Sequence, residues 1–98
     1  MKHKTIKMHS GGIALELDSN SSWADFPKRS RFWATKLGAE VIGDPVITID
    51  ECVLEVKIDN GYFWITYDDF QSSIQLEPKE PGYNDIVLRL QSKLSSGT

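Results

Sequence analysis

Few residues of this 98-residue chain have types that could carry chemistry, and they are scattered along it. His3 and His9 have no cysteine, histidine or paired carboxylate near them at ligand spacing, whereas a metal site needs three or four ligands. Cys52 is the single cysteine, so it can form neither an intrachain disulfide nor a thiolate metal site. We therefore expect two solvated histidines, a small buried cysteine, and no metal or other cofactor.

Three further patterns bear on catalysis and phosphate binding. A nucleophile at Cys52 would need a base within hydrogen-bond reach, and only the two N-terminal histidines could serve. Asp68 and Asp69 could form an acid pair, but consecutive residues of a strand point to opposite faces. Ser10-Gly11-Gly12 lacks the spacing and the lysine of a phosphate-binding loop. The sequence therefore predicts a protein that is not an enzyme.

Charge is distributed unevenly along the chain, although the net charge is only −3. Between Glu40 and Asp85 there are eleven carboxylates and two lysines, so this segment carries a net charge of −9. Basic residues gather in the N-terminal arm and one predicted helix, at Lys2, Lys4, Lys7, Lys28, Arg29, Arg31 and Lys36. The molecule should be electrically two-sided. We expect no nucleic-acid binding, because a basic helix face beside an acidic half is a weak signal.

The apolar pattern predicts an α+β fold, an antiparallel sheet of four to five strands packed against two helices in the order β(β)-α-(β)β-β-β-α. Residues 4–18 alternate around a Ser-Gly-Gly break, which favours a hairpin over one bulged strand. Residues 46–49 form either an edge strand or the lead into the next strand, and residues 73–77 form a later strand.

Two amphipathic helices are predicted. The first helix follows Ser22, which has capping-box spacing from Asp25, and it ends at Gly38. Because proline disrupts a helix interior, this helix starts either at Trp23 or only at Pro27. The second begins near Gly82. Their apolar stripes are Trp23, Phe26, Ser30, Trp33 and Leu37 in the first helix, and Tyr83, Ile86, Val87, Leu90 and Leu94 in the second.

Asn60-Gly61 lies between two strand patterns, residues 52–58 and 62–68, and predicts a type I′ turn. This turn pairs Ile58 with Phe63 and fixes which residues share a face. The core face is Leu54, Val56, Ile58, Phe63, Ile65 and Tyr67. The opposite face, Glu55, Lys57, Asp59, Tyr62, Trp64, Thr66 and Asp68, should be solvated.

The aromatic pair Tyr62 and Trp64 on this outer face suggests a protein interface, since exposed aromatics among carboxylates can bind a basic partner. The candidate partner-binding residues are Glu55, Tyr62, Trp64, Asp68, Asp69 and Glu77. The alternative is that another element, such as the N-terminal strand or residues 46–49, covers this face. Phe32 is a second aromatic outside the main stripes, and it either packs beside the second helix or is exposed.

The length fits one domain, residues 1–98, in which we expect residues 1–3 and 95–98 to be disordered. No apolar stretch approaches the roughly 18 residues that a membrane span needs, and the N-terminus lacks the apolar region of a signal peptide. We therefore expect a cytoplasmic protein without a membrane partner.

The order of parts from about Trp23 to Leu94, with the phrase GYFWITYDDFQSSIQLE at residues 61–77, resembles a known group. It looks like the small immunity proteins that protect bacteria from contact-dependent and other polymorphic toxins. It is equally similar to uncharacterised bacterial domains of this size with a Trp-rich helix before a hairpin. The first resemblance implies a non-enzymatic inhibitor whose acidic surface plugs the basic active site of a nuclease toxin.

These observations together predict a protein-binding module whose partner is another protein with a basic surface. The alternative is a regulatory or structural domain, either a monomer or a homodimer formed through an exposed sheet edge.

Overall fold

The computed structural model describes residues 3–96 of the chain. Along that range the elements are β1 (Thr5–Lys7), β2 (Ile13–Asp18), α1 (Phe26–Lys36), β3 (Glu40–Val41), β4 (Val46–Ile47), β5 (Cys52–Ile58), β6 (Gly61–Asp68), β7 (Ser73–Pro78), the 3₁₀ helix η1 (Pro81–Tyr83) and α2 (Asn84–Ser96). Neither helix in this range has the length and apolar character needed to cross a membrane.

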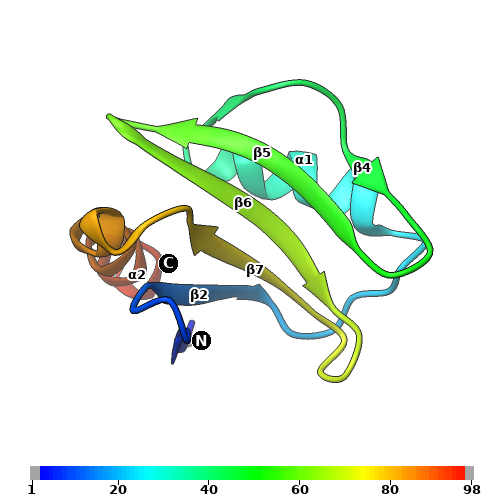
Figure 1. Ribbon diagram of the computed structural model, residues 1–98, viewed down its shortest axis with the longest axis horizontal. Coiled ribbons are helices and arrows are strands. Elements are labelled where there is room, and N and C mark those ends of the chain that lie inside the picture. Colours follow the sequence, from blue (N-terminus) through cyan, green and yellow to red (C-terminus); the bar gives the residue numbers. More distant parts are fainter. Residues whose placement is uncertain (1–2, 97–98) are drawn as a thin grey trace.

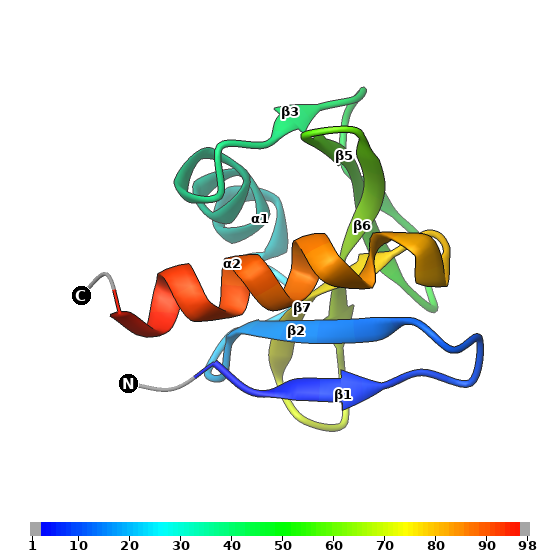
Figure 2. The same cartoon turned by 90° about the vertical axis from the view of Figure 1, so that its left-hand side faces the viewer.

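One antiparallel sheet, in the order β1-β2-β7-β6-β5-β3 with β4 also paired to β5, forms the body of the fold (Figure 1). Both helices lie on the same side of the sheet (Figure 2), so neither lies over the other face. The α+β class, the antiparallel sheet and the N-terminal hairpin are confirmed. The expectation of four to five strands is wrong, because seven strands are described. Of the two alternatives for residues 46–49, the edge strand is found, as the two-residue strand β4 paired to β5. Strand β3 also has two residues, too few for alternation to reveal it.

Alternate residues of the central strands and one stripe of each helix meet in a single apolar core. Both predicted helical stripes are confirmed, since every member is buried or packs against this core. Cys52 is also buried, as expected, and this burial raises the pKa of its thiol. The fully buried core side chains are Leu15, Phe26, Cys52, Leu54, Val56, Phe63, Ile65, Ile74, Leu76 and Val87.

Helix α1 begins at Phe26, between the two starts that the sequence left open. Pro27 lies in the first turn, where its missing N–H removes no helical hydrogen bond. The Ser22 hydroxyl accepts the Asp25 N–H at 3.3 Å and donates to the Asp25 carboxylate at 3.0 Å. This pair therefore closes the turn before the helix. Gly38, with φ of +71°, follows the last turn, as expected.

The β5–β6 hairpin has the predicted faces but not the predicted register. Ile58 pairs with Gly61 instead of Phe63, so the two-residue loop is Asp59-Asn60. Within that loop only Asp59 has a positive φ, +54°, whereas a type I′ turn needs two such residues. The pairing differs from the prediction by two residues, and side chains two apart on a strand point the same way. The predicted core face is therefore correct.

Gly61 is required by packing and not by the turn. A Cβ atom on Gly61 would lie 2.9 Å from Ile86 Cδ1, 2.9 Å from Phe63 Cε1 and 3.1 Å from Tyr83 Cδ1. The first residues of α2 and the preceding 3₁₀ turn therefore press directly on the backbone of β6. This long-range contact, 25 residues away in sequence, explains why the glycine lies inside the strand.

His3, at the start of the described residues, lies beside helix α2. His3 is half-buried and not solvated, because its Nδ1 donates to the Glu16 carbonyl at 3.0 Å and its carbonyl accepts from Gln91 Nε2 at 2.9 Å. Helix α2 continues to Ser96, into the segment expected to be disordered. Residues 1–2 and 97–98 lie outside the described part of the chain.

Candidate functional site

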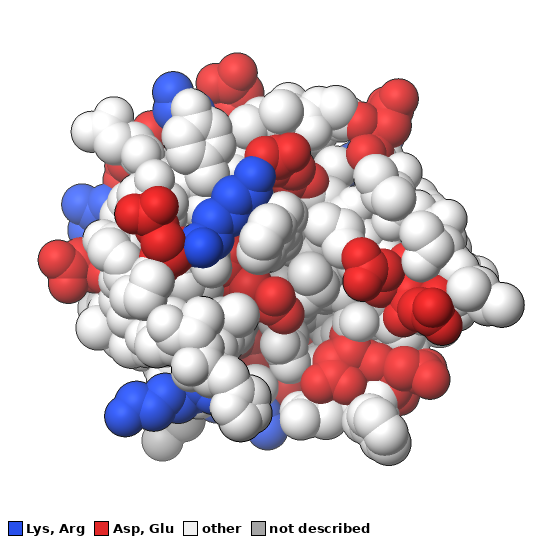
Figure 3. All heavy atoms as spheres, viewed as in Figure 1, with Lys and Arg blue, Asp and Glu red and all other residues white. Residues whose placement is uncertain are grey.

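The sheet face opposite the helices is built by alternate residues of β5, β6 and β7. On β6 these are Tyr62, Trp64 and Thr66; Trp64 lies between Glu55 of β5 and Glu77 of β7 in the strand register. Figure 3 looks onto this face, where acidic side chains gather over the centre and the right-hand half. The face is therefore acidic and aromatic, but most of its side chains are half-buried and not fully solvated.

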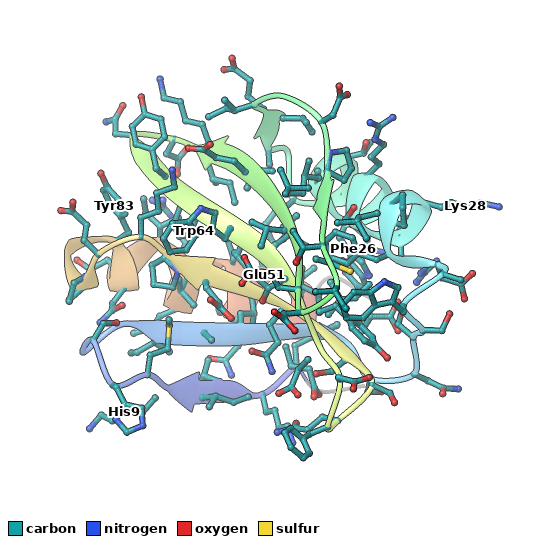
Figure 4. The ribbon with its side chains drawn as sticks, turned by 45° about the vertical axis from the view of Figure 1, so that its right-hand side comes forward. His9, Phe26, Lys28, Glu51, Trp64 and Tyr83 are labelled. Atoms are coloured by element: carbon teal, nitrogen blue, oxygen red, sulfur yellow. The ribbon has the colours of Figure 1, made fainter. Side chains whose placement is uncertain are left out.

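A groove of about 550 Å³ is hollowed into this face next to the indole of Trp64. Part of its lining comes from the segment 42–46, which follows β3 and ends in the first residue of β4. The groove is lined by four apolar side chains, four carboxylates and one hydroxyl, namely Ile42, Val46, Val53, Trp64, Asp44, Glu51, Glu55, Glu77 and Thr66. In Figure 4, Trp64 and Glu51 lie on the same side of the sheet. The indole is neither sealed beneath a helix nor fully exposed; it forms one wall of the groove.

Glu77 is a half-buried carboxylate of the groove. It accepts a hydrogen bond of 2.8 Å from the Thr66 hydroxyl. Burial raises the pKa of the Glu77 carboxyl above its ordinary value, the hydrogen bond from Thr66 opposes this rise, and the negative charges of Asp68 and Glu51 add to it. The site therefore concentrates negative charge where water is partly excluded, which strengthens the attraction for a cation.

Lysines neutralise the Tyr62 end of the same face. Lys79 forms an ion pair with Glu55, and its Nζ lies 5.2 Å from the Trp64 ring centre and 5.9 Å from that of Tyr62. The Lys57 Nζ lies 5.7 Å from the Tyr62 ring centre. The acidic character is therefore displaced from Tyr62 toward Glu77 and the loop that carries Glu51.

Asp68 and Asp69 have different surroundings. Asp68 Oδ1 accepts the N–H groups of Phe70 at 2.9 Å and Gln71 at 3.4 Å, so its carboxylate stabilises the β6–β7 turn. Asp69 is exposed in that turn. Beside it the Phe70 side chain is completely exposed, at 102% of the reference area. Of the six predicted site residues, Glu55, Trp64 and Glu77 line the groove, whereas Tyr62, Asp68 and Asp69 do not.

Sequence reasoning missed the groove residues that come from connections, Asp44 and Glu51 above all. Both were counted among the acidic segment, but nothing in a single sequence places a connecting loop against a sheet face. Val53 shows the alternation of β5 and could have been identified from it. Lys79 follows β7 directly after Pro78 and carries no local signal of its position over the aromatic rings.

Of the basic residues of α1, Arg31 reaches the groove, where it forms an ion pair of 3.4 Å with Asp44; the others lie elsewhere on the surface. Arg29 forms an ion pair of 2.6 Å with Asp18, and Lys28 projects away from the molecule (Figure 4). Phe32 is exposed, at 45%, and packs against Trp33 of its own helix with the Arg29 guanidinium 4.6 Å above its ring. Of the two alternatives for Phe32, the exposed one is therefore found.

Within residues 3–96, no group of three or more histidine, cysteine, aspartate or glutamate side chains is placed to hold a metal ion. His9 is exposed, and Cys52 is buried in the core. No known protein family, curated protein or solved structure matches this chain.

Proposed function

We propose that this protein is a non-enzymatic binding module that recognises a basic protein through the groove beside Trp64. The observation that carries the proposal is the meeting of four carboxylates with an aromatic wall in one hollow on the helix-free face of the sheet. A concave surface with apolar walls and a few charged groups is the form that recognition sites commonly take.

Arginine is the side chain that this groove suits best. Its planar guanidinium can stack on an indole while its N–H groups donate to carboxylates, and it is more weakly hydrated than lysine. The Trp64 ring offers the stacking surface, and Glu77 and Glu51 lie among the groove's acceptors. Glu55 and Asp44 are already paired with Lys79 and Arg31, so they contribute less.

Two exposed apolar side chains extend this surface. Ile49, 93% exposed, lies in the β4–β5 loop, and Phe70 lies in the β6–β7 loop. Both loops emerge from the same end of the sheet, because β5 starts where β6 ends and β7 begins. Large apolar side chains beside a charged groove are typical of interfaces, in which they supply buried area while the charges orient the partner.

The class of partner that we propose is a nuclease-type toxin, whose active site must be basic to bind phosphates. The resemblance to bacterial immunity proteins supports this choice, and the acidic groove supplies the matching charge. An inhibitor of this kind needs no catalytic group of its own.

Affinity capture from the source cells, followed by calorimetry with the purified partner, tests the proposal. Trp64→Ala should weaken binding about 30-fold or more, as expected for a central aromatic residue. Glu51→Lys should also weaken it and reduce its dependence on salt. Glu80→Lys is the matched control, because Glu80 is exposed and lies outside the groove. The proposal fails if the partners are acidic, or if neither groove variant changes their affinity.

The alternative, a homodimer formed through a sheet edge, has less support. The edge strand β1 has three residues and ends in Lys7, and on the other edge Gly43-Asp44-Pro45 separates β3 from β4. Short, charged and interrupted edges are poor templates for strand pairing. Sedimentation that shows a concentration-independent monomer would exclude the homodimer.

A further inference from the structure

A second hollow lies on the opposite, helix-covered side of the sheet. It has a volume of about 650 Å³ and lies between the last turns of α1 and α2 and the end of β2. Its walls are largely apolar, formed by Leu17, Trp33, Leu37, Leu90 and Leu94. The volume falls within the range of small-molecule sites, which runs from about 300 to 1,000 Å³.

Two acidic residues line this cavity, Glu16 and Asp18, and both lie near cations of the protein; Lys4 Nζ is 4.0 Å from the Glu16 carboxylate. A bulge in β2 between Glu16 and Asp18 places Asp18 opposite Ile74, so its side chain points to the helix side. There it accepts hydrogen bonds from Arg29 and, at 3.2 Å, from Trp33 Nε1. Asp18 therefore holds the cavity wall in place and leaves no free negative charge of its own to a ligand.

The two lysines that line the cavity have fewer charged partners than its acidic residues. Lys36 and Lys93, in the last turns of the two helices, both line it, and neither forms an ion pair with any residue from 3 to 96. The Lys36 ammonium lies 5.8 Å from the Trp33 ring centre. Among the described residues, these two positive charges at the hollow therefore have no ion-pair partner.

We propose that this cavity binds a small amphipathic carboxylate, with an apolar body against Trp33 and Leu90 and a carboxylate between Lys36 and Lys93. The charge of the rim selects an anion, and the apolar walls select a hydrocarbon or aromatic body. This site is independent of the acidic groove, because the two lie on opposite faces of the sheet.

Decanoate is a suitable probe, with decanol and decyltrimethylammonium as neutral and cationic counterparts, each titrated into the full chain. Decanoate should bind at least about tenfold more tightly than decanol, a difference of about 1.4 kcal/mol, and the ammonium should bind least. In NMR spectra, the indole N–H signal of Trp33 should shift, whereas that of Trp64 should not. Equal affinity for decanoate and decanol, or no binding of decanoate, would overturn the proposal.

The double variant Lys36→Gln/Lys93→Gln should lower decanoate affinity about tenfold while leaving decanol affinity unchanged. Lys28→Gln/Lys57→Gln is the control, since it removes the same charge outside the cavity. Leu94→Trp should fill the hollow and abolish binding of both probes, and a retained thermal transition would show that it folds. If the double variant lowers stability but not decanoate affinity, the lysines serve only the helix ends and the proposal is wrong.

Discussion

Replacing Gly61 with alanine tests the packing that fixes the register of the β5–β6 hairpin. The new methyl group would lie 2.9 Å from Ile86 Cδ1 and from Phe63 Cε1, closer than carbon atoms normally approach. Overpacking of this kind costs about 1–3 kcal/mol. Alanine also lowers the conformational entropy of the unfolded chain, which offsets about 0.4–1 kcal/mol of this loss in stability. We therefore expect a net loss of about 1–2 kcal/mol, which would lower the melting temperature by roughly 5–15 °C.

The source of this loss can be identified with a double-mutant cycle. Ile86→Val removes the Cδ1 atom that the new methyl would meet, at a cost of about 0.5–1.5 kcal/mol by itself. The Gly61→Ala/Ile86→Val protein should lose less stability than the sum of the losses in the two single variants, by at least about 0.5 kcal/mol. Chemical denaturation of the four proteins measures this coupling.

Gly82→Ala serves as the control, because its nearest neighbour, Glu80 Oε1, is 3.5 Å away and its φ is not positive. It should be neutral or slightly stabilising. If Gly61 instead acted through a left-handed turn conformation, Gly61→Ala would be costly with or without Ile86→Val. Additive effects would therefore refute the packing explanation.

Two acidic residues should give stability profiles of opposite sign. The pKa of Glu77 is raised in the folded state, so the native protein binds a proton more tightly than the unfolded chain does. The folded protein therefore loses stability as pH rises from the pKa of the unfolded chain through the raised pKa of the folded state. Glu77→Gln should therefore be more stable than the parent at pH 7 and lose this advantage in acid, as measured by urea denaturation at both pH values; a less stable variant at pH 7 would contradict this. Burial alone would raise the pKa of Asp18, but hydrogen bonds from Arg29 and Trp33 lower it below its ordinary value. The Asp18 carboxylate therefore stabilises the folded protein at neutral pH, and this stabilisation is lost as pH falls through the lowered pKa. Asp18→Asn should cost roughly 1–2 kcal/mol at pH 7 and much less near pH 2; an equal loss at both would show that charge is not involved.

The periodic parts of this fold could be predicted from the sequence. The stripes of α1 and α2 and the alternation of β5 and β6 are set by burial within single elements, and the residues on each core face are correct. The register of the β5–β6 hairpin could not be predicted from the pattern within single elements. The local signal of Asn60-Gly61 competes with a contact between Gly61 and Ile86, and that contact exists only once α2 is docked.

The candidate groove could be predicted only in part, for a similar reason. Glu55, Trp64 and Glu77 follow from strand alternation, so their common face could be identified. Asp44 and Glu51 come from loops whose path depends on the short pairings of β3 and β4 with β5. The position of Lys79 over two aromatic rings depends on the pairing of β6 with β7, for which the sequence carries no turn signal that fixes the register.

The irregularity in β2 makes the length of this strand indispensable. Leu15 and Leu76 are partners before the bulge, and Asp18 and Ile74 are partners after it, so one strand residue has no counterpart on β7. Removing Leu17, the single residue between Glu16 and Asp18, would restore a continuous ladder with Asp18 still opposite Ile74, but it would take a buried side chain out of the core. Shortening or lengthening this strand by one position should therefore be far more damaging than most substitutions along it.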